Sequence, residues 1–122
     1  MVDLSASYIV GEYLKDKSRE PLYRLAESEL LWEQRIAVVS TYAFIKNSDF
    51  TDIYALAKKL LTHEHDLMRK AIGWMLREAG KRNKDLLVAF LEKYCLAMPR
   101  TMLRYAIEKF PEEERKYYMR KE

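Results

Sequence analysis

RKAIGWMLRE, residues 69–78, begins with a tetrapeptide that recurs along the chain. The pattern Arg-x-Ala-Ile/Val starts at Arg35, Arg69 and Arg104, so successive copies are separated by 34 and 35 residues. A fixed period of this length is typical of repeat proteins, in which each repeat is one supersecondary unit. The period therefore predicts stacked copies of a single unit.

A second series of helix-like segments alternates with these copies. PLYRLAES starts at residue 21, DIYALAKKLL at residue 52 and DLLVAFLEKY at residue 85. Each period thus holds two helices, and stacked helix pairs bury a shared core. Because the tetratricopeptide residue pattern is missing, we expect an all-α, HEAT-like α-solenoid of about four helix pairs, as a single domain over residues 1–122.

Hydrophobic periodicity predicts eight helices. The low content of helix-breaking residues, with only three Gly and three Pro, agrees with this prediction. The helix at 30–46 is apolar nearly all round and should be central and buried. Asp66 is the expected N-cap of the fifth helix. The predicted ranges are 3–14, 19–28, 30–46, 51–61, 66–82, 84–94, 99–110 and a last helix opened by Pro111.

Composition excludes several classes of protein. The net charge of +3 is mild, and a single cysteine, Cys95, excludes an internal disulfide and is expected to be a buried thiol. No apolar run approaches the roughly 18 residues of a membrane span, and no secretion signal is visible, so a cytoplasmic location is expected. His63 and His65 lack the i, i+4 spacing of a helical zinc site. We therefore predict no metal site at these histidines.

The 66–82 helix has an apolar stripe that runs through Met68, Ile72, Met75, Leu76 and Ala79. Trp74 falls outside this stripe, among the basic residues Lys70, Arg77 and Lys81. Trp74 could pack on the next repeat or bind a ligand. Gly73 costs roughly 1 kcal/mol relative to Ala at mid-helix. Its lack of a Cβ would allow a neighbouring helix or a ligand to approach closely.

Arg35, Arg69 and Arg104 occupy equivalent positions in successive repeats. They could pair with carboxylates and pack their stems on neighbouring repeats, or they could line the concave face on which solenoids commonly bind. Arg35 has apolar helix neighbours, which favours a groove or a pairing partner. Trp32 is expected to be a core residue or a hydrophobic staple.

LLWEQRIAVVSTYAFIK (30–46) followed by LMRKAIGWMLREAGKRN (67–83) resembles the AlkD-like family of DNA alkylation repair glycosylases. The likeness covers essentially the whole chain, with KAIGWMLRE as its most specific string. It implies removal of N3- and N7-alkylated purines from duplex DNA by hydrolysis of the glycosidic bond, without metal or cofactor. The expected partner is therefore alkylated duplex DNA, with no membrane.

The resemblance also implies site residues. Val2-Asp3 matches the end of the family's Trp-Asp-x-Val-Asp stretch, so Asp3 would supply the carboxylate. Arg35 matches the arginine of the following long helix, and Trp74 matches the second active-site tryptophan. Lys70, Arg77 and Lys81, with Gly73 for close approach, would contact the DNA backbone.

The family's first tryptophan would lie four residues before Asp3. We therefore interpret the chain as the C-terminal part of a longer glycosylase, with an N-terminal face (Tyr8, Ile9, Leu14) available for self-association. A non-catalytic HEAT-like scaffold that binds DNA or a protein partner is the alternative, because a fold does not dictate a function.

Overall fold

The computed structural model describes residues 20–61 and 63–120, which form seven α-helices and no strand. The predicted all-α repeat fold is confirmed, while the helix expected at 3–14 lies outside the described residues. The helices are α2 (Glu20–Ala26), α3 (Leu31–Lys46), α4 (Thr51–Lys59), α5 (Asp66–Arg82), α6 (Lys84–Tyr94), α7 (Arg100–Ala106) and α8 (Glu112–Arg120).

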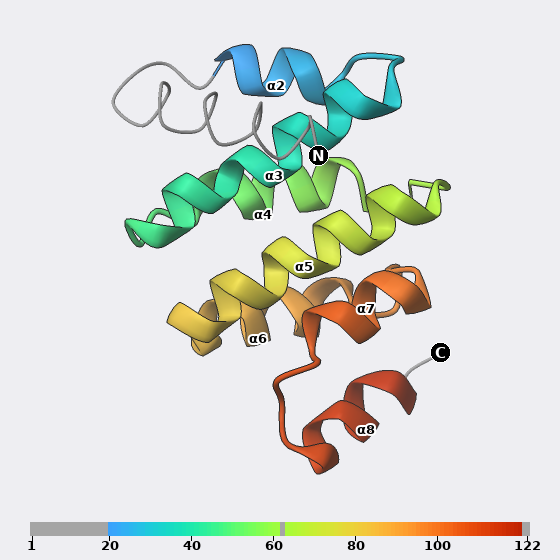
Figure 1. Cartoon of the computed structure of the whole chain (residues 1–122). Coiled ribbons are helices and arrows are strands. Elements are labelled where there is room, and N and C mark those ends of the chain that lie inside the picture. The colour runs from blue at the N-terminus through green and yellow to red at the C-terminus, as the bar shows by residue number, and fades with distance from the viewer. Residues whose placement is uncertain (1–19, 62, 121–122) are drawn as a thin grey trace.

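The helices stack along one direction of the molecule (Figure 1). Helices α3, α5 and α7 form a front row, and α4 and α6 lie behind it. Helix α2 packs on α3 at one end of the stack, and α8 follows α7 at the other end. Since α5 packs against both α3 and α7, the front row is a continuous surface built from equivalent helices of successive repeats.

The largest error in a predicted helix end lies in α7, and one predicted N-cap is also wrong, each for a local reason. The helix expected at 99–110 ends at Ala106, because a turn follows in which the Phe110 N–H donates to the Ile107 carbonyl at 2.9 Å. Pro111 comes next, and the residue before a proline is pushed away from helical geometry. The N-cap of α5 is His65 rather than Asp66: its Nδ1 accepts the Leu67 N–H at 3.2 Å.

Helix α3 is buried over most of its length, as expected from its sequence. Its two buried hydroxyls are satisfied within the helix, since Ser40 donates to the Ile36 carbonyl and Thr41 donates to the Val38 carbonyl. Cys95 is buried as predicted. Trp32 is 55% exposed, so its prediction as a core residue is wrong.

The apolar stripe of α5 forms part of the main core, and all five of its members are buried. The opposite side of this helix is therefore left to face the surface. None of the described helices combines the length and apolar content that crossing a membrane requires.

Candidate functional site

A hollow of about 290 Å³ opens on the front row, where α3, α5 and α7 meet. It brings together four residues that the sequence singled out: Arg35 from α3, and Lys70, Trp74 and Arg77 from α5. On α5 these three follow the i, i+4, i+7 spacing of one helix face. The remaining lining residues are Leu67, Ala71 and Tyr105.

Trp74 is half-buried at the edge of this hollow. Part of its ring packs against the main core, and another part lines the opening. The packing alternative drawn from the sequence is therefore confirmed in part, and the ligand-binding alternative stays a prediction. The ring thus provides an aromatic face beside the positively charged side chains of the hollow.

Arg77 is the most constrained cation of the hollow. Its side chain is 21% exposed, and its guanidinium forms an ion pair with Glu108, which follows α7. A second carboxylate, on Glu78, lies 3.6 Å away. Its Nε is buried and has no hydrogen-bond partner among residues 20–61 and 63–120. Arg77 is therefore held at the hollow with hydrogen-bonding capacity left over.

Lys70 lies one turn before Trp74 and is held by the first residue of its own helix. Its Nζ is 3.0 Å from Asp66 Oδ2. The hydrogen bond that Lys70 donates to Asp66, followed by the negative charge of Asp66 and then by the electrostatic effect of Tyr105, raises the pKa of Lys70 above its usual value. Lys70 is therefore a cation at neutral pH, positioned beside the tryptophan.

Gly73 is buried beneath α7 rather than at the surface. A Cβ at this position would lie 2.6 Å from both the Met102 carbonyl oxygen and the Tyr105 Cβ, closer than real Cβ contacts come. The glycine thus permits the approach of a neighbouring helix, one of the two explanations left open by the sequence. It is this approach that brings Tyr105 to the hollow.

Sequence reasoning missed Tyr105 as a site residue. The signal was available, since Tyr105 is the second residue of the third repeat tetrapeptide and is equivalent to Lys70 in the second. The pattern indicated the helix but could not show how closely α7 approaches α5.

Other predicted residues do not line this hollow. Lys81 lies one turn beyond Arg77, with its Nζ 3.5 Å from Glu78 Oε2. The Arg69 Nε donates to the His63 carbonyl at 2.8 Å, so it supports the α4–α5 connection. Arg104 lines a second hollow instead. Asp3 lies outside the described residues.

The two histidines have structural roles in the α4–α5 connection. The His63 Nδ1 accepts the His65 N–H at 3.0 Å, and its Nε2 is 2.7 Å from Gln34 Oε1 on α3. Desolvation, followed by the charges of His65 and Arg69, lowers the pKa of His63. In the part of the chain that the structure describes, no three His, Cys, Asp or Glu side chains cluster to hold a metal ion.

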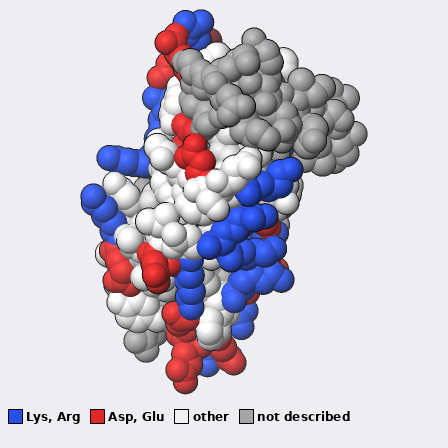
Figure 2. Space-filling view, turned by 90° about the vertical axis from the view of Figure 1, so that its left-hand side faces the viewer, with Lys and Arg blue, Asp and Glu red and all other residues white. Residues whose placement is uncertain are grey.

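Charge is unevenly distributed over the surface. Figure 2 shows a dense group of Lys and Arg side chains at the right of the view, the side that carries the front row in Figure 1. Asp and Glu side chains gather at the lower end. Since the net charge is only +3, this distribution matters more than the total for attracting an anionic polymer.

Comparison with known proteins gives one match. Neither the curated proteins nor the solved structures contain a match to the chain. The family model described as "DNA alkylation repair enzyme" matches residues 1–110, which include every residue of the hollow. This match supports a role in DNA repair. The chain belongs to the DNA alkylation repair enzyme family.

Proposed function

We propose that the chain acts as a DNA glycosylase that hydrolyses the N-glycosidic bond of N3- and N7-alkylated purines in duplex DNA. The observation that carries this proposal is the meeting of Arg35, Lys70, Trp74 and Arg77 in one hollow of a DNA alkylation repair family member. Three cations around an aromatic ring suit a phosphate backbone with a cationic base beside it.

The lesion itself supplies much of the reactivity. A purine alkylated at N3 or N7 carries positive charge, so it leaves as a neutral base without being protonated by the protein. As the C1′–N bond breaks, the sugar gains oxocarbenium character, and a water oxygen bonds to C1′ and releases a proton. A carboxylate stabilises this developing cation electrostatically. Asp3 is our candidate for this carboxylate.

Trp74 would recognise the charge of the alkylated base. A cation over an indole face is stabilised by about 0.5–2 kcal/mol, whereas an unmodified purine lacks this charge. The hollow is shared by three helices and lies on the front row, so the ring can meet DNA without a deep enclosed pocket.

Lys70, Arg77 and Arg35 would bind phosphates, with Arg35 at the phosphate next to the lesion and Lys81 further along the backbone. Phosphate contacts position the protein without reading sequence. This suits a repair protein, which must act in any sequence context.

The test is release of 7-methylguanine from methylated duplex DNA by the chain, beside Asp3→Asn and Trp74→Leu variants, with duplex binding measured separately. Release that falls in both variants supports the proposal. Binding without release, weakened by Lys70→Ala, would instead favour the non-catalytic DNA-binding alternative. Absence of both duplex binding and base release would favour a scaffold that binds a protein partner.

A further inference from the structure

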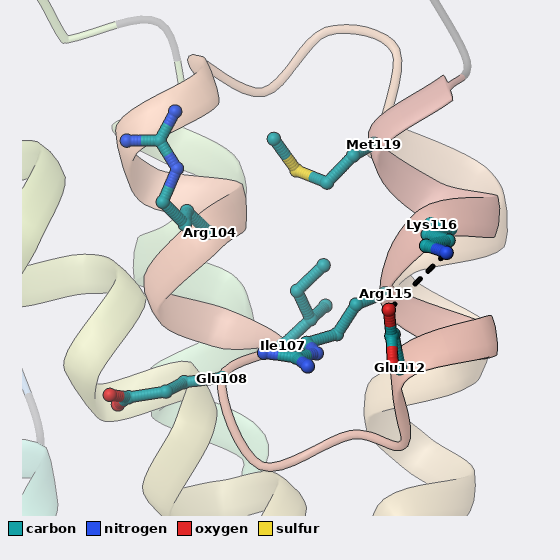
Figure 3. A pocket seen from close by; sticks show the side chains of 7 residues that line it. All are labelled: Arg104, Ile107, Glu108, Glu112, Arg115, Lys116 and Met119. Carbon is teal, nitrogen blue, oxygen red and sulfur yellow. Dashed lines mark ion pairs between the residues drawn. The ribbon is translucent and has the colours of Figure 1, made fainter.

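A second hollow, of about 300 Å³, lies between α7 and α8 (Figure 3). Its apolar part comes from Ile107, which is buried, and from Met119, which points from α8 toward α7. The remaining lining residues are charged: Arg104, Glu108, Glu112, Arg115 and Lys116. An apolar base with charged edges suits a ligand that has both a charged group and an apolar body.

The carboxylates of this hollow are already engaged. Glu112 Oε1 is 3.3 Å from the Lys116 Nζ, as the dashed line in Figure 3 shows. Glu108 points away from the hollow and pairs with Arg77 on α5. Neither carboxylate therefore forms an ion pair with Arg104 or Arg115.

The guanidinium groups of Arg104 and Arg115 have no ion-pair or hydrogen-bond partner among the described residues, and both side chains are exposed. Arg115 extends from α8 toward Ile107, and the Arg104 guanidinium stands on α7, turned away from α8 (Figure 3). Arginine presents a planar fork of donors that matches a phosphate in two-point hydrogen bonding. Arg115 therefore offers an unengaged anion-binding group inside the hollow, and Arg104 offers a second one at its α7 edge.

This hollow continues the surface of the first one. The Arg77–Glu108 ion pair joins a residue that lines the first hollow to a residue that lines the second. Tyr105 and Arg104 are likewise neighbours on α7, each lining one of the two hollows. A polymer that lies across Lys70 and Trp74 can therefore extend over α7 toward α8.

We propose that the α7–α8 hollow binds the DNA phosphate backbone that flanks the alkylated base pair, with Arg104 and Arg115 as the phosphate ligands. Met119 would contact the adjoining deoxyribose. This inference rests on the proposed function. It also extends the DNA surface beyond the family match, since α8 follows residue 110.

The expected reach follows from helix packing. Neighbouring helix axes lie about 8–10 Å apart, so two steps from α5 to α8 span about 16–20 Å. At about 3.4 Å per base pair this corresponds to about 5–6 base pairs. A duplex that extends only about three base pairs on each side of a methylated purine should not reach α8, whereas one with about ten on each side should.

The test compares an Arg104→Ala/Arg115→Ala double variant with a Lys58→Ala/Lys93→Ala control by fluorescence anisotropy on both duplexes across a salt series. The control removes the same charge from exposed lysines of α4 and α6. We expect the arginine variant to bind the long duplex about 5- to 50-fold more weakly, with a salt slope lower by about 2. On the short duplex the loss should be smaller, because about three base pairs reach Arg104 on α7 but not Arg115 on α8.

Four outcomes would overturn the inference. The first is a salt slope on the long duplex that the arginine variant leaves unchanged although Lys70→Ala lowers it. In that case the proposed function stands, but DNA does not bind the α7–α8 hollow. An equal loss in the lysine control would assign the effect to net charge. An equal loss on both duplexes would exclude a flanking contact. If the unaltered chain binds neither duplex, the proposed function fails together with the inference.

Discussion

Gly73 on α5 and Tyr105 on α7 lie so close that a Cβ on the glycine would be 2.6 Å from the Cβ of the tyrosine. The same Cβ would also lie 2.6 Å from the Met102 carbonyl oxygen, which is main chain and cannot swing aside. The contact sets the spacing of two repeats, and with it the position of Tyr105 at the hollow.

We therefore expect Gly73→Ala to destabilise the protein, although alanine is the better helix former by about 1 kcal/mol. Overpacking typically costs about 1–3 kcal/mol, and the backbone obstruction places this site at the upper end. Urea unfolding measures the change. Because α7 must shift, affinity for methylated duplex should fall as well.

Gly80→Ala provides the matched control on the same helix. The Cβ at Gly80 would meet the end of the Leu87 side chain, which can rotate away. We expect this variant to be neutral or slightly stabilising. Equal destabilisation by both substitutions would show that the α5–α7 approach is not special.

Glu108→Gln tests the ion pair that connects the two hollows. Glutamine keeps an oxygen that accepts from Arg77 but removes a negative charge beside the proposed path of the DNA. We expect duplex affinity to rise by about two- to tenfold at low salt, since like-charge repulsion of phosphate is lost. Stability should change by about 0–1 kcal/mol, as is usual for exposed pairs. Weaker binding would instead mean that Glu108 holds Arg77 in its DNA-binding position.

The repeat period predicted the class of fold and most of its helices, because hydrophobic periodicity is a local property. The ranges 66–82 and 84–94 agree with α5 and α6. The wrong predictions concern features that depend on tertiary packing or on the geometry of a single turn. Trp32 reads as a core residue but is exposed at the start of α3, and the helix from Pro99 stops at Ala106 in a turn before Pro111.

The candidate site could be predicted only in part for the same reason. Lys70, Trp74 and Arg77 share one helix face, so their neighbourhood follows from spacing alone. Arg35 reaches the same hollow from another helix, which the equivalence of the repeats and the family resemblance indicated. Tyr105 depends on how closely α7 packs against Gly73, and no local pattern reports this distance.

Asp66→Asn should strengthen DNA binding. Asp66 pairs with Lys70 and raises its pKa, so removal of the carboxylate leaves Lys70 available to phosphate and removes a repelling charge. We expect a two- to fivefold gain in duplex affinity, on the order of one surface charge interaction. Lys70→Ala should lower the slope of log affinity against log salt by about 1. A Lys70→Ala slope equal to that of the unaltered chain would remove Lys70 from the interface.

His63 predicts a loss of stability in mild acid. Desolvation and the charges of His65 and Arg69 hold its folded-state pKa below the ordinary value of 6.5. As the pH falls below 6.5, the unfolded chain binds more protons than the folded chain, because its histidine has the higher pKa. The contribution of His63 to stability is therefore complete above pH 6.5 and is lost as the pH falls through the folded-state pKa. Protonation also removes the Nδ1 acceptor of the His65 N–H.

The check is the melting temperature between pH 7.5 and 5 for the chain and for His63→Asn. The asparagine oxygen can still accept the His65 N–H but does not titrate in this range. We expect its melting temperature to fall less on acidification. Parallel curves for the two proteins would place the acid sensitivity elsewhere.

Trp74→Leu should separate lesion recognition from general DNA binding. Leucine preserves much of the apolar packing against the core but has no π face, so preference for methylated over unmodified duplex should fall by about 2- to 30-fold, equivalent to about 0.5–2 kcal/mol. Affinity for unmodified duplex should change little, because Lys70, Arg77 and Arg35 remain. Trp74→Phe retains an aromatic face and should fall between the two.

The melting temperature decides how the Trp74 result is read. Trp74 is half-buried, so a moderate loss of stability is expected in both variants and should be similar for leucine and phenylalanine. A loss of preference that follows aromatic character rather than melting temperature assigns the ring to recognition of the cationic base. A loss that follows melting temperature makes the ring a packing residue between α5 and its neighbours.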